Sequence, residues 1–587
     1  MENKKYYTDE RNVQIVVSLL KAHGIRKVVV SPGTTNLTLV GSLMYDGEFE
    51  LYSSVDERSA AYLACGLASE SGEPVALSCT GATASRNYMP GLTEAYYRKL
   101  PILAITSHQG INRIGHLIPQ NIDRRVTPND ITRLSVALPV ISNKADERFC
   151  EIEANKAMLE LKRNGGGPVH INLFTTYSRN FNIKTLPPAH VIRRYSYFDT
   201  LPEIPCGNGH IAVFIGSHKD FSEEETKAID RFCASYDAVV FCDHTSGYHG
   251  YYGVHSSLIF RQKAGAKQLL NIDTLIHIGE VSGDYDGTPT GVKHVWRVSE
   301  DGELRDTFGT LTNVFQVKEL YFFSHYQEND DHKEEYLMQY KSLYQSIIEK
   351  IPEIPFSNIW IASILHNKFP VGSQVHLGIL NTLRSWNMFL LPTGVTSRCN
   401  VGGFGIDGIL STLVGSSLAN PNKLFYGILG DLAFFYDLNA LGNRHIGKNL
   451  RILLVNNGRG TEFRNYDHPC SAFGDDADKF MSAAGHFGQQ SKDLVKHYAE
   501  DLGFNYISAS SKEEFLSCYE SFISSEVGDK SIIMECFTDS EDESKALNNI
   551  RSIIVEDTTR TFKDKAKVVI ANTIGEKGMQ IIDILRH

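Results

Sequence analysis

Cysteines in this chain of 587 residues never occur as a CxxC pair; all ten are scattered singly. The sequence therefore predicts neither a zinc site nor a disulfide framework, and we expect buried, reduced thiols. No stretch approaches the roughly 18 uninterrupted apolar residues of a membrane-spanning helix. Residues 1–14 also lack the apolar core of a signal peptide, so we expect a cytoplasmic protein with no membrane partner.

A basic excess is missing too, because the formal net charge is −11. A chain of this charge is not expected to have nucleic acid as a general partner. The strand-like run HIAVFIG (210–216) continues as SHKD and not as a GxGxxG loop, which argues against a flavin or a nicotinamide. The spacing of His244, His249 and His255 fits no standard zinc pattern, so we do not expect a second metal there.

What the sequence has is a repeated alternation of short β-rich runs and helical stretches, which is the pattern of parallel α/β sheets. The chain is too long for one hydrophobic core, since single cores stop growing at roughly 250–300 residues. Proline-containing segments at 182–195 and 350–357 are the expected linkers. The sequence thus predicts an α/β fold of three parallel-sheet domains, at residues 1–185, 186–350 and 351–545, followed by a helical extension at 546–587.

The most informative segment is 427–463, where two buried strands each end in polar residues. Asp431 follows one strand, and Asn457 ends the next strand 26 residues later. Neighbouring parallel strands bring their carboxyl ends to one edge of the sheet, where α/β proteins bind ligands. A carboxylate, an amide oxygen and a backbone carbonyl of the following turn, taken at Arg459, suit Mg²⁺ that also binds phosphate oxygens.

Either dipeptide alone, Gly430-Asp431 or Asn456-Asn457, is an ordinary turn, but together at this spacing they predict a metal–diphosphate site. The pair resembles the signature of the thiamine-diphosphate-dependent enzymes, and GDLAFFYDLNAL (430–441) is most similar to the MenD family of carboligases. The resemblance covers the chain to about residue 545. It implies thiamine diphosphate and Mg²⁺ as cofactors and the pyruvate-decarboxylase-like fold, with pyrimidine-binding, central and diphosphate-binding domains in that order.

The same resemblance requires a glutamate near residue 55 that follows a strand and begins a helix, and Glu57 meets this requirement. In the family this glutamate hydrogen-bonds the aminopyrimidine and shares a proton with it, which burial of the carboxyl favours. The alternative is an acid that only stabilises the helix N-terminus. With the metal motif present, we interpret Glu57 as catalytic. Small residues that follow it predict close packing of the helix: Ala60, Ala61, Ala64 and Gly66.

Further segments match the family locally. Gln120, in IPQNID, lies where related enzymes place a glutamine beside the active site, so the resemblance implies a catalytic role. Ile406, in GGFGIDG, is the expected apolar prop that bends the cofactor; core packing is the other interpretation. The remaining residues assigned to cofactor binding are Thr80, Gly81, Gly405, Gly430, Asp431, Leu432, Asn457 and Gly460.

The predicted substrate pocket departs from the family. MenD enzymes join a unit from 2-oxoglutarate to isochorismate, and both substrates carry carboxylates that arginines recognise. Three of the four arginines that the family pattern requires are replaced, and only Arg384 matches. The replacements are Thr35, Gln109 and Val401. We assign substrate binding to Thr34, Thr35, Arg384 and His108, with Arg398 and Arg459 as further candidates, although Arg384 equally suits a surface helix.

The sequence therefore predicts a transferase or lyase that decarboxylates a 2-oxo acid and transfers the acyl unit to an unidentified acceptor. Because the family builds each site from two subunits, the resemblance implies a dimer or tetramer in which Glu57 and Asp431 meet between chains. Two alternatives stay open: a true MenD synthase with an altered site, and a cofactor-binding scaffold or regulator without activity. The joint presence of Glu57, Asp431 and Asn457 counts against the scaffold.

Overall fold

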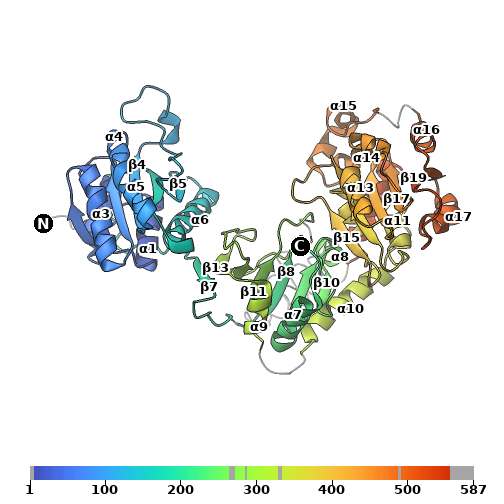
Figure 1. Cartoon of the computed structure of the whole chain (residues 1–587), viewed down its shortest axis with the longest axis horizontal. Coiled ribbons are helices and arrows are strands. Elements are labelled where there is room, and N and C mark those ends of the chain that lie inside the picture. The colour runs from blue at the N-terminus through green and yellow to red at the C-terminus, as the bar shows by residue number, and fades with distance from the viewer. Residues whose placement is uncertain are drawn as a thin grey trace, which may run out of the picture. The chain divides into compact units, whose positions relative to one another are not determined.

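Parallel β-sheets flanked by helices organise the whole chain (Figure 1). Every described strand pair within the three sheets is parallel, so the predicted α/β fold with three parallel sheets is confirmed. By its internal contacts the chain forms two compact units, residues 1–201 with 301–316, and residues 202–300 with 317–587. The computed structural model describes residues 5–205, 207–263, 271–284, 287–327, 333–486 and 491–554.

The sheet of the first unit has the strand order β2-β1-β3-β4-β6-β5. Strands β3, β4 and β6 are buried along their whole length, as continuous apolar runs covered by helices on both faces should be. The strand bounds are Lys27–Val30 (β1), Glu50–Ser53 (β2), Val75–Cys79 (β3), Ile102–His108 (β4), Leu134–Leu138 (β5) and Val169–Phe174 (β6).

Alternate residues of these strands feed two separate cores. Val28, Ala76 and Leu103 face the core that also includes side chains of α1, α2 and α6. Val29 and Leu77 face the core shared with α3, α4 and α5. The period-2 alternation of side chains along a strand produces this division. The helices are Arg11–Ala22 (α1), Leu37–Asp46 (α2), Glu57–Ser71 (α3), Thr83–Asn87 (α4), Met89–Arg98 (α5) and Lys144–Glu160 (α6).

Helix α3 packs closely against α5 through small residues, as its sequence predicts. Ala60, Ala61 and Ala64 are buried, and Gly91 of α5 comes so near Ala61 that no Cβ would fit there. The prediction was wrong for Gly66, which is exposed and has open space around it. Close packing therefore fixes the first half of α3, the half that begins with Glu57.

Replacing Gly91 with alanine is expected to destabilise the first unit by about 1–3 kcal/mol, because its core has no room for the added methyl group. A Cβ at this position would lie 2.4 Å from Cβ of Ala61 and 2.9 Å from its carbonyl carbon. Gly66→Ala is the matched control, since nothing lies within 4 Å of a Cβ there, and it should stabilise the helix by up to about 1 kcal/mol. Urea unfolding measures both changes, and a shift of the same sign in the two variants would contradict this packing.

The second unit holds a six-stranded sheet with the order β15-β14-β16-β17-β19-β18. Numbered from its own first strand, this is the order of the first sheet, although the sequence shows no internal repeat. In each sheet the third and fourth strands lie side by side at the centre, so their carboxyl ends form equivalent edges. The bounds are Gln374–Leu377 (β14), Thr396–Cys399 (β15), Phe425–Gly430 (β16), Leu450–Asn456 (β17), Asn505–Ala509 (β18) and Ile532–Phe537 (β19).

Helices of this unit include α11 (Asn358–Leu365), α12 (Asn381–Trp386), α13 (Ile409–Ala419), α14 (Asp431–Tyr436) and α18 (Ser540–Arg551). The predicted extension at 546–587 begins inside α18, and residues 555–587 lie outside the described part of the chain. No helix in the described ranges is both long enough and apolar enough to cross a membrane.

The central strands belong to both units. Five of them, in the order β10-β9-β8-β11-β12, lie in the second unit, and β13 pairs with β7 in the first. The predicted linker at 182–195 overlaps the beginning of β7. Their bounds are Arg193–Ser196 (β7), His210–Ile215 (β8), Val239–Cys242 (β9), Gly253–His255 (β10), Ile272–Ile278 (β11), His294–Val298 (β12) and Leu311–Gln316 (β13). Nine cysteines are free thiols, and Cys206 lies outside the described residues.

Candidate active site

Asp431 lies at the carboxyl end of β16 as the first residue of α14, and it is only 4% exposed. Its Oδ1 accepts a hydrogen bond from its neighbour Leu432 N at 2.7 Å, and its Oδ2 accepts one from Gly458 N at 2.6 Å. Burial raises the pKa of this carboxyl to about 6, against the opposing effect of these backbone donors. A buried carboxylate with a raised pKa is a group that a bound cation would stabilise.

The turn that follows β17 meets Asp431 directly. Strands β16 and β17 pair in parallel with Gly430 opposite Val455, so the two chain ends arrive together at the sheet edge. Gly458 has a φ of +74°, which a glycine adopts without strain and which turns its N–H towards Asp431. The structure thus brings Asp431 and the residues around Asn457 to one place, as the spacing predicts.

Three buried polar atoms at this edge have no hydrogen-bond partner among the described residues: Asn457 Oδ1, Thr461 Oγ1 and Arg459 Nε. Buried polar groups are normally satisfied, and each exception calls for an explanation. An amide oxygen without a donor, beside a buried carboxylate, suits an oxygen-preferring cation. The guanidinium of Arg459 is itself paired with Asp478 at 2.7 Å, so a contribution of Arg459 to a metal would come from its backbone carbonyl.

A second layer of hydrogen bonds fixes this turn. Asn456 Oδ1 accepts from Gly458 N at 3.2 Å, and its Nδ2 donates to Glu535 Oε1 at 2.6 Å. Glu535 also accepts from the hydroxyl of Tyr506 at 2.7 Å. Burial raises the pKa of Glu535 while the two donors lower it. The first asparagine of the pair therefore positions the turn, and the second has its amide oxygen available.

A cavity of about 90 Å³ opens beside Asp431. Six of the residues assigned to the cofactor line it: Ile406, Gly430, Asp431, Leu432, Asn457 and Gly460. Ile406 also packs against the hydrophobic core, so its two interpretations both describe its position. Gly405 lies just before it, in the loop that leads into α13. A Cβ on Gly460 would lie 3.0 Å from Phe463 Cδ2 and 3.2 Å from Leu432 Cδ1, so these side chains would have to shift to admit one.

Arg384, on α12, forms an ion pair with Glu462, which lines the same cavity. Both side chains are largely buried. The structure therefore places the predicted substrate arginine behind a residue of the cavity wall, paired with that carboxylate of the protein. Its assignment to the substrate stays a prediction. Arg398, the further candidate, pairs instead with Asp220 at 2.6 Å.

In the first unit, Glu57 is the first residue of α3, where Asp56 caps the helix by accepting from Ser59 N at 3.0 Å. Glu57 is partly exposed, and its Oε2 accepts a hydrogen bond from Asn87 Nδ2 at 3.1 Å. Asn87 ends the short helix α4 that follows Thr80 and Gly81. Glu57 and the turn after β3 therefore lie on one side of this unit.

The other residues assigned in the first unit gather at the same sheet edge. A Cβ on Gly81 would lie 3.1 Å from the carbonyl oxygen of Gln120 and 3.2 Å from Cβ of His108. A Cβ on Gly33 would overlap the methyl group of Thr80, which holds the chain before Thr34 close to that strand. The Gln120 side chain is exposed, and its φ of +65° is unusual for a residue with a Cβ.

Thr34 and Thr35 differ in their surroundings. Thr34 is exposed. Thr35 is 3% exposed, and its hydroxyl donates to the carbonyl of Ser107 at 2.6 Å. That hydrogen bond links the segment after β1 to the end of β4, and it uses the proton of the Thr35 hydroxyl. The substrate role assigned to Thr35 stays a prediction.

The histidines of the central region lie close together without forming a metal cluster. The rings of His244 and His255 are 4.7 Å apart, and His244 bonds to the carbonyl of Phe389 at 2.9 Å. Burial holds the pKa of His244 to about 4. Among the described residues no group of three or more His, Cys, Asp or Glu side chains is placed to hold a metal ion. The metal site expected at Asp431 has one carboxylate, with an amide oxygen and a backbone carbonyl as its other ligands. It therefore does not count as a group of three or more such side chains.

Sequence reasoning missed two charged residues at these edges. Glu543, on α18, is buried, accepts from Asn358 N at 2.9 Å, and has its pKa raised to about 7 by burial. Arg124, four residues after Gln120, is buried beside Gly81. Both lie in strongly charged stretches, EDES and DRR, which by pattern alone indicate a solvated surface. Only the three-dimensional fold shows their burial.

Two parallel sheets of this chain have the same strand order. Asp431 and the Asn457 turn meet at the edge of one sheet, and the helix that begins with Glu57 belongs to the unit of the other. These features indicate the class of enzyme. Residues 11–126 match the family model for the thiamine pyrophosphate enzyme N-terminal domain, which binds the cofactor. The chain belongs to the thiamine-diphosphate-dependent enzymes. It is 29% identical over 568 residues to 2-succinyl-5-enolpyruvyl-6-hydroxy-3-cyclohexene-1-carboxylate synthase of Phocaeicola vulgatus, covering 92% of this chain and 98% of the relative.

The synthase of the same description from Bacteroides thetaiotaomicron is also 29% identical, over 571 residues, with the same two coverages. These matches span nearly the whole chain, so the enzyme is of the MenD type. A solved structure, the Rhodococcus jostii RHA1 thiamine diphosphate-dependent 4-hydroxybenzoylformate decarboxylase, matches at 16% identity and a TM-score of 0.38, covering 90% of this chain and 99% of that one. That score is too low to support a conclusion.

Proposed function

We propose that this enzyme is a thiamine-diphosphate- and Mg²⁺-dependent carboligase that decarboxylates a 2-oxo acid and transfers the acyl unit to an acceptor other than that of the MenD synthases. The observation that carries the proposal is the meeting of Asp431 with the Asn457 turn. There a buried carboxylate and an unpartnered amide oxygen face one cavity. Bound thiamine diphosphate supplies the electron sink for breaking and making a bond next to a carbonyl.

The residues at this edge fit the metal and the diphosphate. Asp431, Asn457 Oδ1 and the backbone carbonyl of Arg459 would hold Mg²⁺, which prefers oxygen ligands and usually keeps phosphate among them. Ile406, Leu432 and Gly460 would shape the apolar part of the cavity. Bound cation would also favour the ionised form of Asp431, whose pKa is raised by burial.

Glu57 would hold and pass a proton at the pyrimidine ring. Its hydrogen bond from Asn87 fixes the direction of the carboxyl group. In a single chain Glu57 is partly exposed, so a covering surface is needed to give it the desolvated surroundings that favour a shared proton. We propose that this surface comes from a second copy of the chain, which makes the active unit at least a dimer. The three domains at 1–185, 186–350 and 351–545 are part of the same proposal.

The acceptor is proposed to differ because the pocket lacks three arginines of the MenD pattern, replaced at Thr35, Gln109 and Val401. The Thr35 hydroxyl is committed to Ser107, and Val401 is buried. Neither side chain offers a cation to a substrate carboxylate. A true MenD synthase with a rearranged pocket is the second candidate, favoured by the match to synthases over 92% of the chain.

Incubating the full chain with thiamine diphosphate, Mg²⁺ and a panel of 2-oxo acids, with release of carbon dioxide as the signal, tests the proposal. Release with at least one donor is expected, and addition of isochorismate should give no adduct. Adduct formation at a normal rate would establish the true synthase. Cofactor binding without release from any donor would establish the inactive scaffold.

Mixing two inactive variants tests the two-chain site. After subunit exchange between Glu57→Gln and Asp431→Asn proteins, a mixed dimer carries one site with both changes and one site with neither. Activity should then recover to about a quarter of the wild-type value, since half the dimers are mixed and each has one intact site. If each chain builds its own site, the mixture stays inactive, and incubation of either variant with itself provides the background.

A further inference from the structure

Arg124 is an arginine buried without a carboxylate. Its side chain is 3% exposed, and its Nη2 donates to Asn172 Oδ1 at 2.8 Å and to the carbonyl of Thr106 at 3.3 Å. Its Nε and Nη1 have no hydrogen-bond partner, and within the described ranges no carboxylate lies within ion-pair distance. The next residue, Arg125, is exposed and pairs with Asp123 at 2.7 Å. Burial of an unpaired charge is costly, so Arg124 calls for an explanation.

Other buried polar atoms near Arg124 are unsatisfied. These are Nδ2 of Asn172, whose Oδ1 accepts from Arg124, and both ring nitrogens of His108, whose Cβ lies near the same point of the Gly81 turn as Arg124 Nη1. Burial, with the nearby charge of Arg124, holds the pKa of His108 to about 4, so the imidazole is neutral at pH 7. Each unmade hydrogen bond in such a place destabilises the fold. The cluster is rich in donors and lacks a single anion to accept from them.

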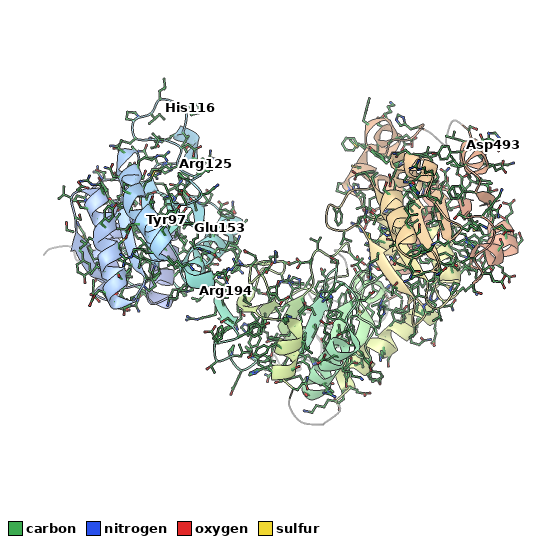
Figure 2. All side chains as sticks on the ribbon, viewed as in Figure 1. Tyr97, His116, Arg125, Glu153, Arg194 and Asp493 are labelled. Carbon is green, nitrogen blue, oxygen red and sulfur yellow. The ribbon has the colours of Figure 1, made fainter. Side chains whose placement is uncertain are left out.

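This cluster lies at the predicted cofactor edge of the first unit. Nη1 of Arg124 would be 3.0 Å from a Cβ on Gly81, and the carbonyl oxygen of Gln120 and Cβ of His108 are equally near that point. Arg124 thus contacts the turn after β3 and the end of β4, where substrate residues are expected. In Figure 2, His116 and Arg125 label two points of the segment that follows β4 and that includes Arg124.

We propose that Arg124, with His108 beside it, binds a substrate carboxylate that is retained in the product. The inference rests on the proposed function. A cation placed at the carboxylate that leaves as carbon dioxide would stabilise the ground state and slow the reaction, because that charge is lost in the transition state. The partner of Arg124 is therefore a second carboxylate, on the donor or on the acceptor.

This assignment explains the altered pocket. The chain has no arginine at Thr35 or Gln109, and Arg124 brings a guanidinium to the same edge from further along the segment after β4. Nη2 is already used, so a carboxylate would accept a single charge-assisted hydrogen bond from the unused Nη1 or Nε of the guanidinium. The cavity now beside Arg124 is about 20 Å³, room for one water molecule. A carboxylate therefore enters only when the walls of this cavity move apart.

Binding of non-reacting acids to the full chain with thiamine diphosphate and Mg²⁺ tests the assignment without turnover. Glutarate mimics a donor with a second carboxylate, and cyclohex-1-enecarboxylate mimics a ring acceptor. Calorimetry with Arg124→Gln should show about 10- to 100-fold weaker binding of one of these acids, since a charge-assisted hydrogen bond is lost. Arg125→Gln is the matched control and should bind both acids as the wild type does. The acid that weakens identifies the source of the carboxylate.

Arg124→Lys keeps the charge and should retain part of the affinity, which a packing role would not predict. Thermal unfolding of each variant separates loss of binding from loss of the fold, and the lysine variant stands in if the glutamine variant does not fold. Unchanged binding in Arg124→Gln, equal binding of the amide analogues of both acids, or no binding of either acid to wild type would overturn the assignment. None of these outcomes depends on carbon dioxide release, so failure of the proposed function is seen separately.

Discussion

Replacing Glu57 with glutamine is expected to lower kcat by about 100-fold or more, the usual contribution of a positioned proton-transfer group. Glutamine keeps the length of the side chain and an oxygen that can accept from Asn87, so the hydrogen bond at 3.1 Å can survive. What it loses is the ability to share a proton with the pyrimidine ring. Affinity for the cofactor should change by less than about tenfold, because most of the binding contacts remain.

Steady-state carbon dioxide release and quenching of tryptophan fluorescence by the cofactor measure these two effects separately. Glu70→Gln is the matched control, because Glu70 lies on the same helix and is exposed. It should leave both quantities unchanged. A Glu57→Gln enzyme with normal turnover would show that the proton is handled elsewhere and that the catalytic role of Glu57 is wrong.

Replacing Asp431 with asparagine is expected to abolish binding of Mg²⁺ and, with it, of the diphosphate. A ligand present at 100 times its Kd stabilises a fold by about 2.7 kcal/mol, and this gain should appear in the wild type and be absent in the variant. Urea unfolding with and without cofactor measures the difference. Asp529→Asn, an exposed acid, is the control. Cofactor-dependent stabilisation of equal size in Asp431→Asn would show that the metal does not bind at this edge of the sheet.

Without metal, the same substitution should act on the pH dependence of stability. The folded-state pKa of Asp431 is raised to about 6 from an ordinary value of 3.8, so the folded chain holds this proton more tightly than the unfolded chain does. The resulting penalty is absent below pH 4, grows as pH rises towards 6, and reaches on the order of 3 kcal/mol above it. The wild type should lose this stability over that window, and Asp431→Asn should not. If the free energy of unfolding changed equally with pH in the wild type and in Asp431→Asn, the raised pKa of Asp431 would be contradicted.

Most of the architecture of this enzyme can be predicted from its sequence. Continuous apolar runs such as β3 and β17 have no polar face, so they predict buried strands covered on both sides, and the structure has them. The meeting of Asp431 with the Asn457 turn follows from connectivity alone, because a crossover between neighbouring parallel strands must return to the same edge. Glu57 came from the family resemblance, and its place at the start of a helix agrees with that.

The buried charged residues near the expected substrate site, and part of the packing, could not be predicted from the sequence, for physical reasons. Arg124 stands in a run of three charged residues that by pattern belongs on the surface, and its burial depends on a segment folding back over β4 and β6. Gly66 follows the alanines of α3 yet faces open space, because small side chains do not reveal which way a helix is rotated. The recurrence of one strand order in two sheets left no trace in the sequence, since topology depends on connections and not on residue identity.

The bond between the Thr35 hydroxyl and the Ser107 carbonyl has an evolutionary consequence. The hydroxyl of Thr175 donates in turn to the carbonyl of Thr35 at 3.2 Å. Thr35 is therefore a buried residue that links the segment after β1 to the ends of β4 and β6. An arginine introduced there would have to break these hydrogen bonds and bury its charge, at a cost of several kcal/mol. A single substitution at Thr35 therefore cannot restore the arginine of the MenD pattern without destabilising the fold.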